Sequence, residues 1–400
     1  RGKHDWVYDL DITSMYPSTI MSLNISPETK LGKLDSWDVE SFLKGVDKTY
    51  SIKDQNGKES AKLTTAEFKN FLKDNNVSIS TNGVLYTQDR KGLIPTLLEK
   101  WFDDRVQFRK LAKKFADSGD KEKHAYFDRR QYIQKVVLNS LYGVLGLPVF
   151  RFYDVDNAEA TTLTGQDLIK FTEKIANYYY NQQLGDKEDY CIYTDTDSVF
   201  YPALPLVKNR YPNADLDDEE FMTTQILKIA HEVQDYINKS YDVFARRMLN
   251  VKGGHRFDIK QECIAKSAFW VTKKRYGQWI INDGGVKCDK VDVKGLDIVR
   301  SNFPPAMRDL MKVILKGILS NVDKDILDEK IIEFKKDMKN MSIYDVALPT
   351  GVSELTKFID KRHSNKKIYG DGTIFTDIRK GAPVHVKAAI KYNDLLKHFG

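Results

Sequence analysis

Two aspartates separated by a single residue are the clearest candidates for chemistry in the sequence. Segment 193–198 places Asp195 and Asp197 between two short apolar runs, which predicts a hairpin with both carboxylates at its turn. Because side chains alternate along a strand, we expect both carboxylates on the same side. Two like charges this close cost free energy unless a cation neutralises them, so a hard divalent metal ion would fit. The alternative is a solvated turn, since Asp favours turns.

A second acidic strand end contains Asp9 and Asp11, near the end of an apolar stretch at 6–12. If the two strand ends are adjacent, their carboxylates could hold a pair of magnesium ions. Paired metals can activate an attacking 3′ hydroxyl and stabilise the leaving oxygen of an in-line phosphoryl transfer. The alternative is that an aspartate only caps the following helix, and for Asp9 we favour this alternative.

Basic residues at helical spacing form the third candidate. Arg105 and Arg109 lie four residues apart and share one helix face. Lys135 and Asn139 have the same spacing, and Tyr142 follows on their face. Facing cations would bind a triphosphate, because Arg offers a planar fork and Lys a point charge. The alternative is ordinary solvated helix surface, since this region carries further cations at Lys110, Lys113, Lys114, Arg129 and Arg130.

The apolar pattern predicts the elements that position these side chains. Residues 6–12 read as a strand, and a helix begins near Tyr16 with Pro17 in its first turn. A helical hairpin is expected at 95–117 and 120–145, interrupted by a Ser-Gly break. The polar region 30–90 predicts an insertion with a small strand or two. The remaining predictions are helices at 157–183 and 217–249, strands within 190–201, 255–264, 268–274 and 277–293, and a mainly helical tail from Pro304.

Length and charge limit the class of protein. At 400 residues and 41% hydrophobic content, the chain exceeds what one core usually organises, which predicts two or three subdomains that share a cleft. The net charge of +6 is local, because residues 361–400 alone hold nine Lys or Arg against three Asp. Such a segment can meet nucleic acid phosphates, an anionic membrane or only solvent.

The cysteines and the apolar runs indicate the compartment. Cys191, Cys263 and Cys288 lack the spacing of a zinc site or disulfide framework, so we expect an intracellular setting, which is the host cytoplasm if the source is viral. No apolar run reaches membrane-spanning length, so we expect a soluble protein with no membrane partner. The chain starts without Met and enters an apolar strand almost at once. Arg1 is therefore expected to be a cut point within a longer polypeptide.

Three ordered motifs resemble the polymerase motifs of DNA polymerase family B. They are Asp11-x-x-Ser14-Met15-Tyr16-Pro17, Lys135-x-x-x-Asn139-Ser140-Leu141-Tyr142-Gly143 and Tyr193-x-Asp195-Thr196-Asp197-Ser198. Segment 273–276 resembles the lysine-tyrosine motif of the family, and segment 92–96 resembles the segment that opens its fingers subdomain. Details at 24–29 and 273–276 are most similar to the replicases of T-even-type bacteriophages. Three motifs in the order of the family are far more specific than any one of them.

The resemblance implies an activity and its metal ligands. The expected activity is that of a DNA-directed DNA polymerase, which adds deoxynucleotides to a primer with two Mg²⁺ ions, or with Mn²⁺ in their place. Asp11 and Asp197 would be the bridging ligands, and Asp195 an accessory carboxylate. Glu262 matches a further acidic position near that site.

The resemblance also implies how the incoming triphosphate is held. Arg105, Arg109 and Lys135 would bind its phosphates, and Asn139 would support it. Lys135 would also act in catalysis, because it contacts charge that redistributes during the transfer.

Residues around the sugar and base are implied in the same way. Ser14, Met15 and Tyr16 would contact the nucleotide, with Tyr16 beneath the deoxyribose as a steric gate against a 2′ hydroxyl. The family usually has Leu where this chain has Met15, a replacement of similar volume. Tyr142 and Gly143 match positions that test the shape of the nascent base pair.

The implied fold is an α+β right-hand polymerase architecture. An antiparallel-sheet palm would comprise 1–29 and 146–294, an insertion 30–91, helical-hairpin fingers 92–145 and a mainly helical thumb 295–400. Primer-template DNA and deoxynucleoside triphosphates would be the partners, and an exonuclease part before Arg1 and a sliding clamp are further candidates. The residues expected to bind DNA are Lys274 and Tyr276 on the primer strand, and Lys361, Arg362, Lys366 and Lys367 on duplex phosphates.

Two rival interpretations stay open. The first is a polymerase that copies RNA or uses ribonucleotides, whose paired-aspartate hairpin can look similar; Tyr16 and the helix containing Lys135 argue against it. The second is a catalytically silent, polymerase-shaped DNA-binding subunit. Retention of the aspartates and of the cationic set argues against a silent subunit.

Overall fold

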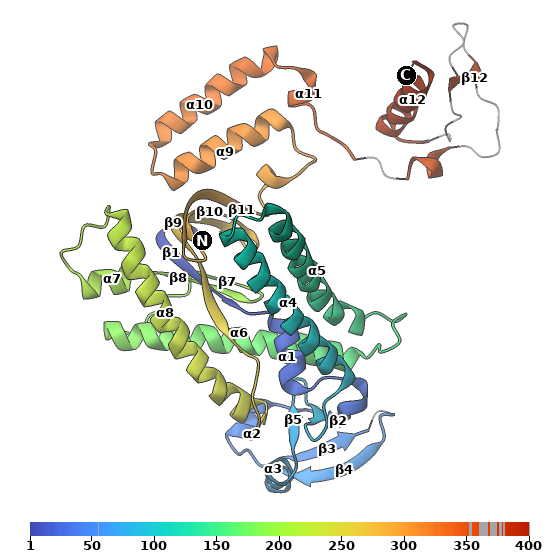
Figure 1. Cartoon of the computed structure of the whole chain (residues 1–400), viewed down its shortest axis with the longest axis vertical. Coiled ribbons are helices and arrows are strands. Elements are labelled where there is room, and N and C mark those ends of the chain that lie inside the picture. The colour runs from blue at the N-terminus through green and yellow to red at the C-terminus, as the bar shows by residue number, and fades with distance from the viewer. Residues whose placement is uncertain are drawn as a thin grey trace. The chain divides into compact units, whose positions relative to one another are not determined.

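The computed structural model (Figure 1) describes residues 1–54, 56–351, 354–359, 367–368, 374–375, 378 and 381–399. The chain forms two compact units: Arg1–Phe269 with Gln278–Lys290, and Trp270–Gly277 with Val291–Gly400. Helices and antiparallel strands give it the predicted α+β class. Among the residues described, no helix is long and apolar enough to cross a membrane.

A six-stranded sheet has the strand order β11-β10-β9-β1-β8-β7. Strand β1 (Gly2–Ile12) pairs antiparallel with β8 (Ser198–Pro202), which pairs antiparallel with β7 (Tyr193–Asp195). Five consecutive residues of β1, 6–10, are buried, because other elements cover both faces of this strand. The pairing of Asp11 with Ser198 brings the two predicted acidic strand ends together.

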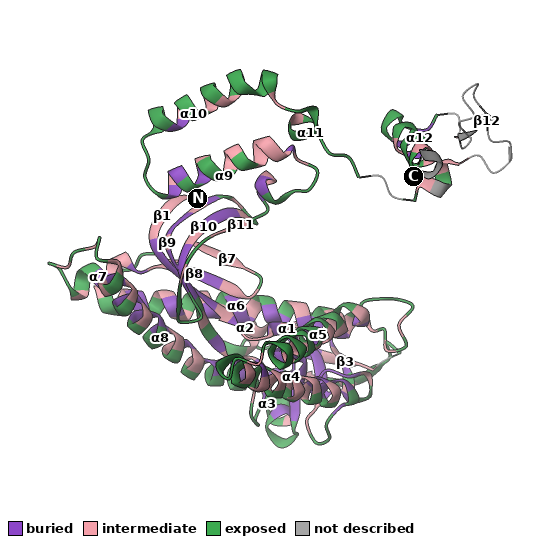
Figure 2. Ribbon diagram, turned by 45° about the horizontal axis from the view of Figure 1, so that its top comes forward, coloured by how far each residue is buried: buried purple, intermediate pink, exposed green. Residues whose placement is uncertain are grey.

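Long helices pack around the strands of the first unit. Helices α6 (Val155–Leu184) and α8 (Glu219–Val243) contact each other. Helix α6 also contacts strand β8, and α8 contacts strand β1. Their inner faces share one core with the sheet, visible as purple segments in Figure 2. Helix α1 (Met15–Leu23) starts three residues after β1 and packs on α6. This arrangement fixes the start of α1 beside the acidic strand ends.

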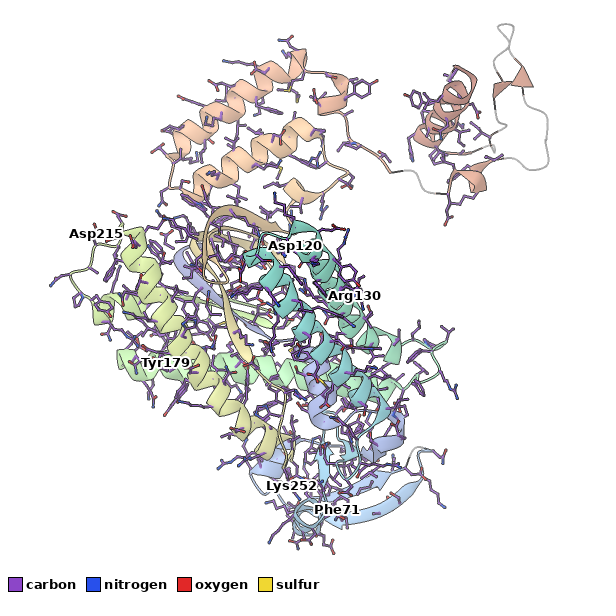
Figure 3. All side chains as sticks on the ribbon, viewed as in Figure 1. Phe71, Asp120, Arg130, Tyr179, Asp215 and Lys252 are labelled. Carbon is purple, nitrogen blue, oxygen red and sulfur yellow. The ribbon has the colours of Figure 1, made fainter. Side chains whose placement is uncertain are left out.

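The predicted helical hairpin is present as α4 (Leu93–Asp117) and α5 (Lys121–Leu145), which lie side by side (Figure 1). Asp120, labelled in Figure 3, caps α5 by accepting a hydrogen bond from the backbone N–H of Lys123. The Phe115 and Phe127 rings stack across the hairpin with centroids 5.5 Å apart. The Arg130 guanidinium lies 4.9 Å from the centroid of the Phe108 ring. Aromatic packing therefore holds the two helices together near their tip.

Region 30–90 holds more structure than the predicted strand or two, so that prediction is wrong. It forms a five-stranded sheet of order β4-β3-β2-β6-β5 with two short helices. The aromatic rings of Trp37, Tyr50 and Phe68 form much of its separate core. These residues come from a loop, a strand and a helix that are apart in sequence and meet only in the folded region, which hides them from a local pattern. The elements are β2 (Lys30–Leu34), α2 (Val39–Leu43), β3 (Thr49–Lys53), β4 (Glu59–Thr64), α3 (Thr65–Asp74), β5 (Val77–Ile79) and β6 (Val84–Thr87).

Three other strand boundaries differ from the prediction. The expected strands 255–264 and 268–274 fall largely within one strand, β9 (Ile259–Thr272). The expected strand 277–293 is mostly a hairpin of β10 (Arg275–Asp283) and β11 (Val286–Lys294). Gly284 and Gly285 form its turn with φ of 58° and 84°, a conformation that glycine adopts readily. Helix α7 (Leu204–Arg210) was not predicted, and α8 continues as a π-helix, Phe244–Met248.

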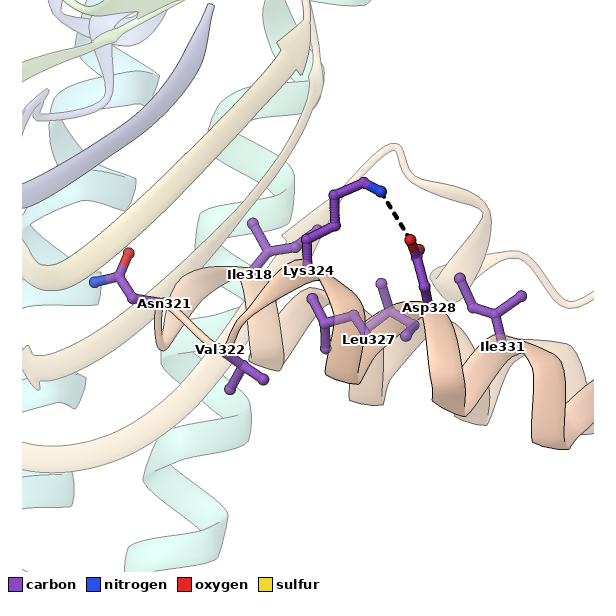
Figure 4. A pocket seen from close by; sticks show the side chains of 8 residues that line it. Ile318, Asn321, Val322, Lys324, Leu327, Asp328 and Ile331 are labelled. Atoms are coloured by element: carbon purple, nitrogen blue, oxygen red, sulfur yellow. Dashed lines mark hydrogen bonds and ion pairs between the residues drawn. The ribbon is translucent and has the colours of Figure 1, made fainter.

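The second unit is mainly helical, as predicted for the tail. A cavity of about 440 Å³ lies between α9 (Pro305–Leu319) and α10 (Lys324–Asp337), and the side chains of Ile318 and Leu327 are among those that line it (Figure 4). Lys324 and Asp328 form an ion pair of 2.8 Å at this cavity. The other elements are α11 (Ile343–Val346), β12 (Lys367–Ile368), β13 (Ile374–Phe375) and α12 (Val384–Phe399).

Candidate active site

Asp11 and Asp197 lie next to each other at the paired ends of β1 and β8. The backbone N–H of Ile12 donates to the carbonyl oxygen of Asp197 at 2.9 Å. The Ser198 hydroxyl donates to Oδ2 of Asp11 at 2.8 Å. The end of β1 and the turn before β8, from distant parts of the chain, therefore present these carboxylates together, as the sequence predicted. No role was predicted for Ser198, although it belongs to the same motif as Asp197.

Both carboxyl groups lie in surroundings that oppose ionisation. Burial, together with the nearby charges of Asp197 and Glu262, raises the pKa of Asp11 to about 7. Burial also raises the pKa of Asp197; the charges of Asp195 and Glu262 act in the same direction, and Lys135 acts in the opposite one. The four predicted acidic residues and Lys135 therefore form one cluster of interacting charges. The acidic residues are Asp11, Asp195, Asp197 and Glu262.

The turn that carries Asp195 and Asp197 differs from the predicted alternation. Asp195 ends β7, whereas Asp197 lies in the turn that follows. Thr196 has a left-handed φ of 58°, and the N–H of Asp197 donates to the carbonyl oxygen of Asp195 at 2.7 Å. The expectation that strand alternation aligns the two carboxylates is wrong, because a tight turn intervenes. It is the turn that sets their proximity.

Asp9 does not cap a helix, so that prediction is also wrong. Its side chain is only 8% exposed, and its Oδ1 accepts a hydrogen bond of 2.6 Å from the backbone N–H of Cys263. Burial and the neighbouring Glu262 raise the pKa of Asp9 to about 6, against the lowering effect of the Cys263 N–H. Asp9 therefore links β1 to β9 through the backbone of Cys263.

We expect Asp9→Ala to lower the free energy of unfolding by ~1–3 kcal/mol, because it leaves the buried N–H of Cys263 without an acceptor. Its effect on catalysis in folded protein should be much smaller than that of Asp11→Ala. Denaturant unfolding and an activity assay on both variants measure the two effects. Asp9→Asn is the matched control, because its amide oxygen can still accept the hydrogen bond. Equal stability of wild type and Asp9→Ala would contradict the role given to this residue.

The cationic residues of the hairpin are in place to bind an anion. Arg105 is partly buried, and its Nε–H has no hydrogen-bond partner among the residues described. Burial and the charge of Arg109 lower the pKa of Arg105. Lys135 and Asn139 are exposed on α5, one helical turn apart. A buried guanidinium N–H without a protein acceptor is costly, and an incoming phosphate oxygen would satisfy it.

Tyr16 contacts Tyr142 at the start of α1. Their ring centroids are 4.5 Å apart with an interplanar angle of 36°. Ser14 precedes the helix in a left-handed conformation, and Met15 is only 4% exposed. Gly143, next to Tyr142, has open space around it, since a Cβ there would meet no described atom within 4 Å. The two predicted nucleotide-contacting motifs therefore meet through these rings.

The backbone before α1 is held by a residue that the sequence analysis did not select. The N–H of Thr13 donates to the carbonyl oxygen of Asp258 at 2.8 Å, and the Thr13 hydroxyl donates to the Asp258 carboxylate at 3.3 Å. Ser18 closes the first turn with a hydrogen bond from its hydroxyl to the carbonyl oxygen of Thr13. These bonds fix the start of α1. Asp258 stands alone between Phe257 and Ile259, so the sequence around it does not indicate that it holds the start of α1.

The predicted DNA-binding residues belong to the second unit. Lys274 is exposed in the turn between β9 and β10, with a left-handed φ of 59°. Tyr276 is only 6% exposed, and its ring stacks on Trp270 with centroids 5.9 Å apart. Lys361, Arg362 and Lys366 lie outside the described residues, and of Lys367 only the backbone, in β12, is described.

The acidic pair fits a hard divalent cation in chemistry and in charge. Carboxylate oxygens are the ligands that Mg²⁺ prefers, and a cation would offset the burial and the mutual repulsion that raise the pKa values of Asp11 and Asp197. Within the described ranges, no three His, Cys, Asp or Glu side chains converge as a preformed metal cage. Mg²⁺ commonly takes one or two protein carboxylates and completes its shell with waters and substrate phosphates. Asp11 and Asp197 meet that requirement.

Residues 4–371 match the description of DNA polymerase family B, and the chain therefore belongs to this family.

Its relatives include the DNA-directed DNA polymerase of Escherichia phage RB69, 25% identical over 80% of this chain and 39% of that protein. The DNA-directed DNA polymerase of Enterobacteria phage T4 is 23% identical over 99% of this chain and 46% of that protein. The DNA polymerase of Paramecium bursaria Chlorella virus NY2A is 28% identical over 96% of this chain and 34% of that protein. The chain thus spans less than half the length of these relatives.

Proposed function

We propose that this chain is the polymerising part of a DNA polymerase that adds deoxynucleotides to a primer under the direction of a template, in DNA replication. The observation that carries the proposal is the Asp11 and Asp197 pair, with Lys135 within electrostatic reach. The names of the relatives, from phages to a Chlorella virus, support the same activity.

The elements around this pair support a subdomain assignment. We assign residues 1–29 and 146–294 to the palm and 92–145, the α4–α5 hairpin, to the fingers. Residues 295–400 would form the thumb, and 30–91 an insertion in the palm. Lys274, Tyr276 and the basic residues of the C-terminal segment would contact primer-template DNA, mainly through its phosphates.

The acidic pair would hold two divalent metal ions, which supply a polarised 3′ hydroxyl and charge stabilisation at the leaving oxygen. Asp11 and Asp197 would provide the shared ligands, and Asp195 and Glu262 would add negative charge around them. The Ser198 hydroxyl fixes the orientation of the Asp11 carboxylate. Asp9 keeps β9, and with it Glu262, against β1.

Cations of the hairpin would bind and position the triphosphate. The Nε–H of Arg105 would donate to a phosphate oxygen, since no described protein group accepts it. Lys135 would stabilise negative charge that builds up on the phosphates during transfer, because it is exposed and near Asp197. Arg109 and Asn139 would complete this surface.

Arg105→Lys is expected to raise the KM for nucleotides about tenfold, or ~1.4 kcal/mol, because the charge stays but the planar fork is lost. Steady-state incorporation with a primed template measures the change. Arg129→Lys, an exposed Arg on α5 with no assigned role, is the matched control and should leave KM unchanged. An unchanged KM in Arg105→Lys would indicate that Arg105 is only a solvated helix residue.

Primer extension with Mg²⁺ and four deoxynucleoside triphosphates tests the proposed function. We expect extension by this chain, or by a longer polypeptide that contains it, only when template, primer and divalent ion are all present. Lack of extension by both proteins would contradict the proposal. Preferential extension with ribonucleotides would favour the rival polymerase class instead.

A further inference from the structure

Segment 24–29, which follows α1, binds the first turn of helix α4. The backbone N–H of Leu93 donates to Oε1 of Glu28 at 2.5 Å, and the N–H of Ile94 donates to the Ser26 hydroxyl at 3.4 Å. The Ser26 hydroxyl in turn donates to Oε2 of Glu28 at 2.7 Å. The first N–H groups of a helix lack partners within the helix, so Glu28 and Ser26 cap α4 from another part of the chain. Glu28 also supplies negative charge there, since the first turn of α4 has no acidic residue of its own.

The residues just before α4 are held by the same segment. The Asn24 side-chain amide donates to the backbone carbonyl oxygens of Thr87 and Arg90 at 2.7 and 2.9 Å. Its Oδ1 accepts the N–H of Gly92 at 2.8 Å, and since Asn24 is buried, these bonds are costly to lose. A Cβ at Gly92 would lie only 2.6 Å from Cβ of Ser26, so no larger residue fits without a shift. Hydrogen bonds and close packing therefore fix the start of α4 against this segment.

The direction of α4 depends on how its start is held. All of α4 is described, and its buried residues are Ile94, Pro95 and Leu98 near the start and Ala112 further along. An α-helix rises ~1.5 Å per residue, which places Arg105 about 18 Å along the axis from the start. A tilt of about 5° at the start would therefore move Arg105 by about 1.6 Å. A misplacement of about 1 Å can cost up to about a hundredfold in rate at an active site.

We infer that Glu28 is a positioning residue for the incoming triphosphate: by capping α4 from segment 24–29, it holds the direction of the helix that carries Arg105 and Arg109. This inference rests on the proposed function, in which both guanidinium groups bind the triphosphate. Loss of the cap would let the start of α4 fray or shift. Any such shift draws the guanidinium groups away from the phosphates they fit, so binding weakens whichever way the helix moves.

The test is the KM for the complementary deoxynucleotide on a primed template, measured together with kcat and with the Tm of the protein. Glu28→Ala is expected to raise KM at least about threefold, with a smaller change in kcat. Glu28→Gln keeps an acceptor for the Leu93 N–H and should restore most of the wild-type KM. A substitution that only destabilised the fold would lower the active fraction, and with it the apparent kcat, but would leave KM unchanged.

Glu67→Ala is the matched control, because Glu67 caps a different helix. Its carboxylate accepts a hydrogen bond of 2.8 Å from the N–H of Thr64 in the capping box of α3, a helix with no residue assigned to the site. Its loss should lower Tm without changing KM. If Glu28→Ala does not fold, Glu28→Asp replaces it, because the shorter side chain keeps the charge but cannot reach both Leu93 and Ser26 as Glu28 does.

A wild-type KM in folded Glu28→Ala would overturn the inference. So would an equal rise of KM in Glu67→Ala, or an equal rise in Glu28→Gln, which keeps the acceptor. A titration of the deoxynucleotide against the complex with a primer that ends in a dideoxynucleotide measures the same contact without turnover, and Glu28→Ala should weaken it by a similar factor. Failure of the proposed function has a different signature, because wild-type protein would then add no deoxynucleotide, which would overturn both proposals. An active wild type with an unchanged KM in Glu28→Ala refutes only the role of Glu28.

Discussion

Asp197→Ala is expected to abolish nucleotide addition, by at least about a thousandfold in rate, while primer-template binding stays close to that of wild type. The carboxylate would position the metal ions, whereas most contacts to duplex phosphates would come from other parts of the chain. Single-turnover incorporation and a DNA-binding titration measure the two quantities. Folding should be retained or improved, because the substitution removes a partly buried carboxylate repelled by Asp195 and Glu262.

Asp215→Ala provides the matched control for Asp197→Ala. Asp215 lies on the loop between α7 and α8, away from the acidic pair, and is labelled in Figure 3. Its loss should change neither incorporation nor DNA binding. Near-normal incorporation by Asp197→Ala would refute the metal assignment. A parallel loss of DNA binding would show instead that Asp197 acts through the fold.

Tyr16→Ala is expected to raise the ribonucleotide-to-deoxynucleotide efficiency ratio by about a hundredfold or more, with a smaller loss for deoxynucleotides. In the proposed function the ring lies beneath C2′ of the sugar, so its removal would open that space without altering Asp11 or Asp197. The ratio of kcat/KM values for matched ribo- and deoxynucleotides measures the change. Since Met15 stands where the family usually has Leu, the wild-type ratio itself could be raised.

Tyr16→Phe is the control, because it keeps the ring and its contact with Tyr142. Its ratio should stay near that of wild type. If the Tyr16 ring only fastens α1 to its neighbours, Tyr16→Ala would weaken folding and depress both substrates alike. An unchanged ratio in folded Tyr16→Ala protein would remove the main reason for naming deoxynucleotides as the substrate.

The sequence predicted which acidic residues meet, but not how. Asp11 and Asp197 belong to motifs with strong local patterns, and the pairing of Asp11 with Ser198 confirms that their strands are neighbours. The roles of Asp9 and of the turn at Thr196 depend on backbone partners contributed by other segments, which no local pattern reveals. Asp9 was therefore misread as a helix cap, although it binds the backbone of β9.

The same difference between local sequence patterns and contacts made by distant segments explains which other parts of the fold could be predicted. The hairpin α4–α5 was predictable because its apolar residues repeat at helical spacing. The five-stranded sheet of region 30–90 was not, because residues such as Trp37 and Phe68 form a core only after the chain folds.

The central claim is that the Asp11 and Asp197 site adds the deoxynucleotide that the template specifies. Single-nucleotide incorporation opposite each of the four template bases, with Mg²⁺ and each deoxynucleotide in turn, tests it most directly. We predict that the complementary deoxynucleotide is favoured in kcat/KM by at least about a hundredfold at every template base, and that Asp11→Asn removes incorporation of all four. Incorporation that ignores the template base, or that survives in Asp11→Asn, would contradict the account.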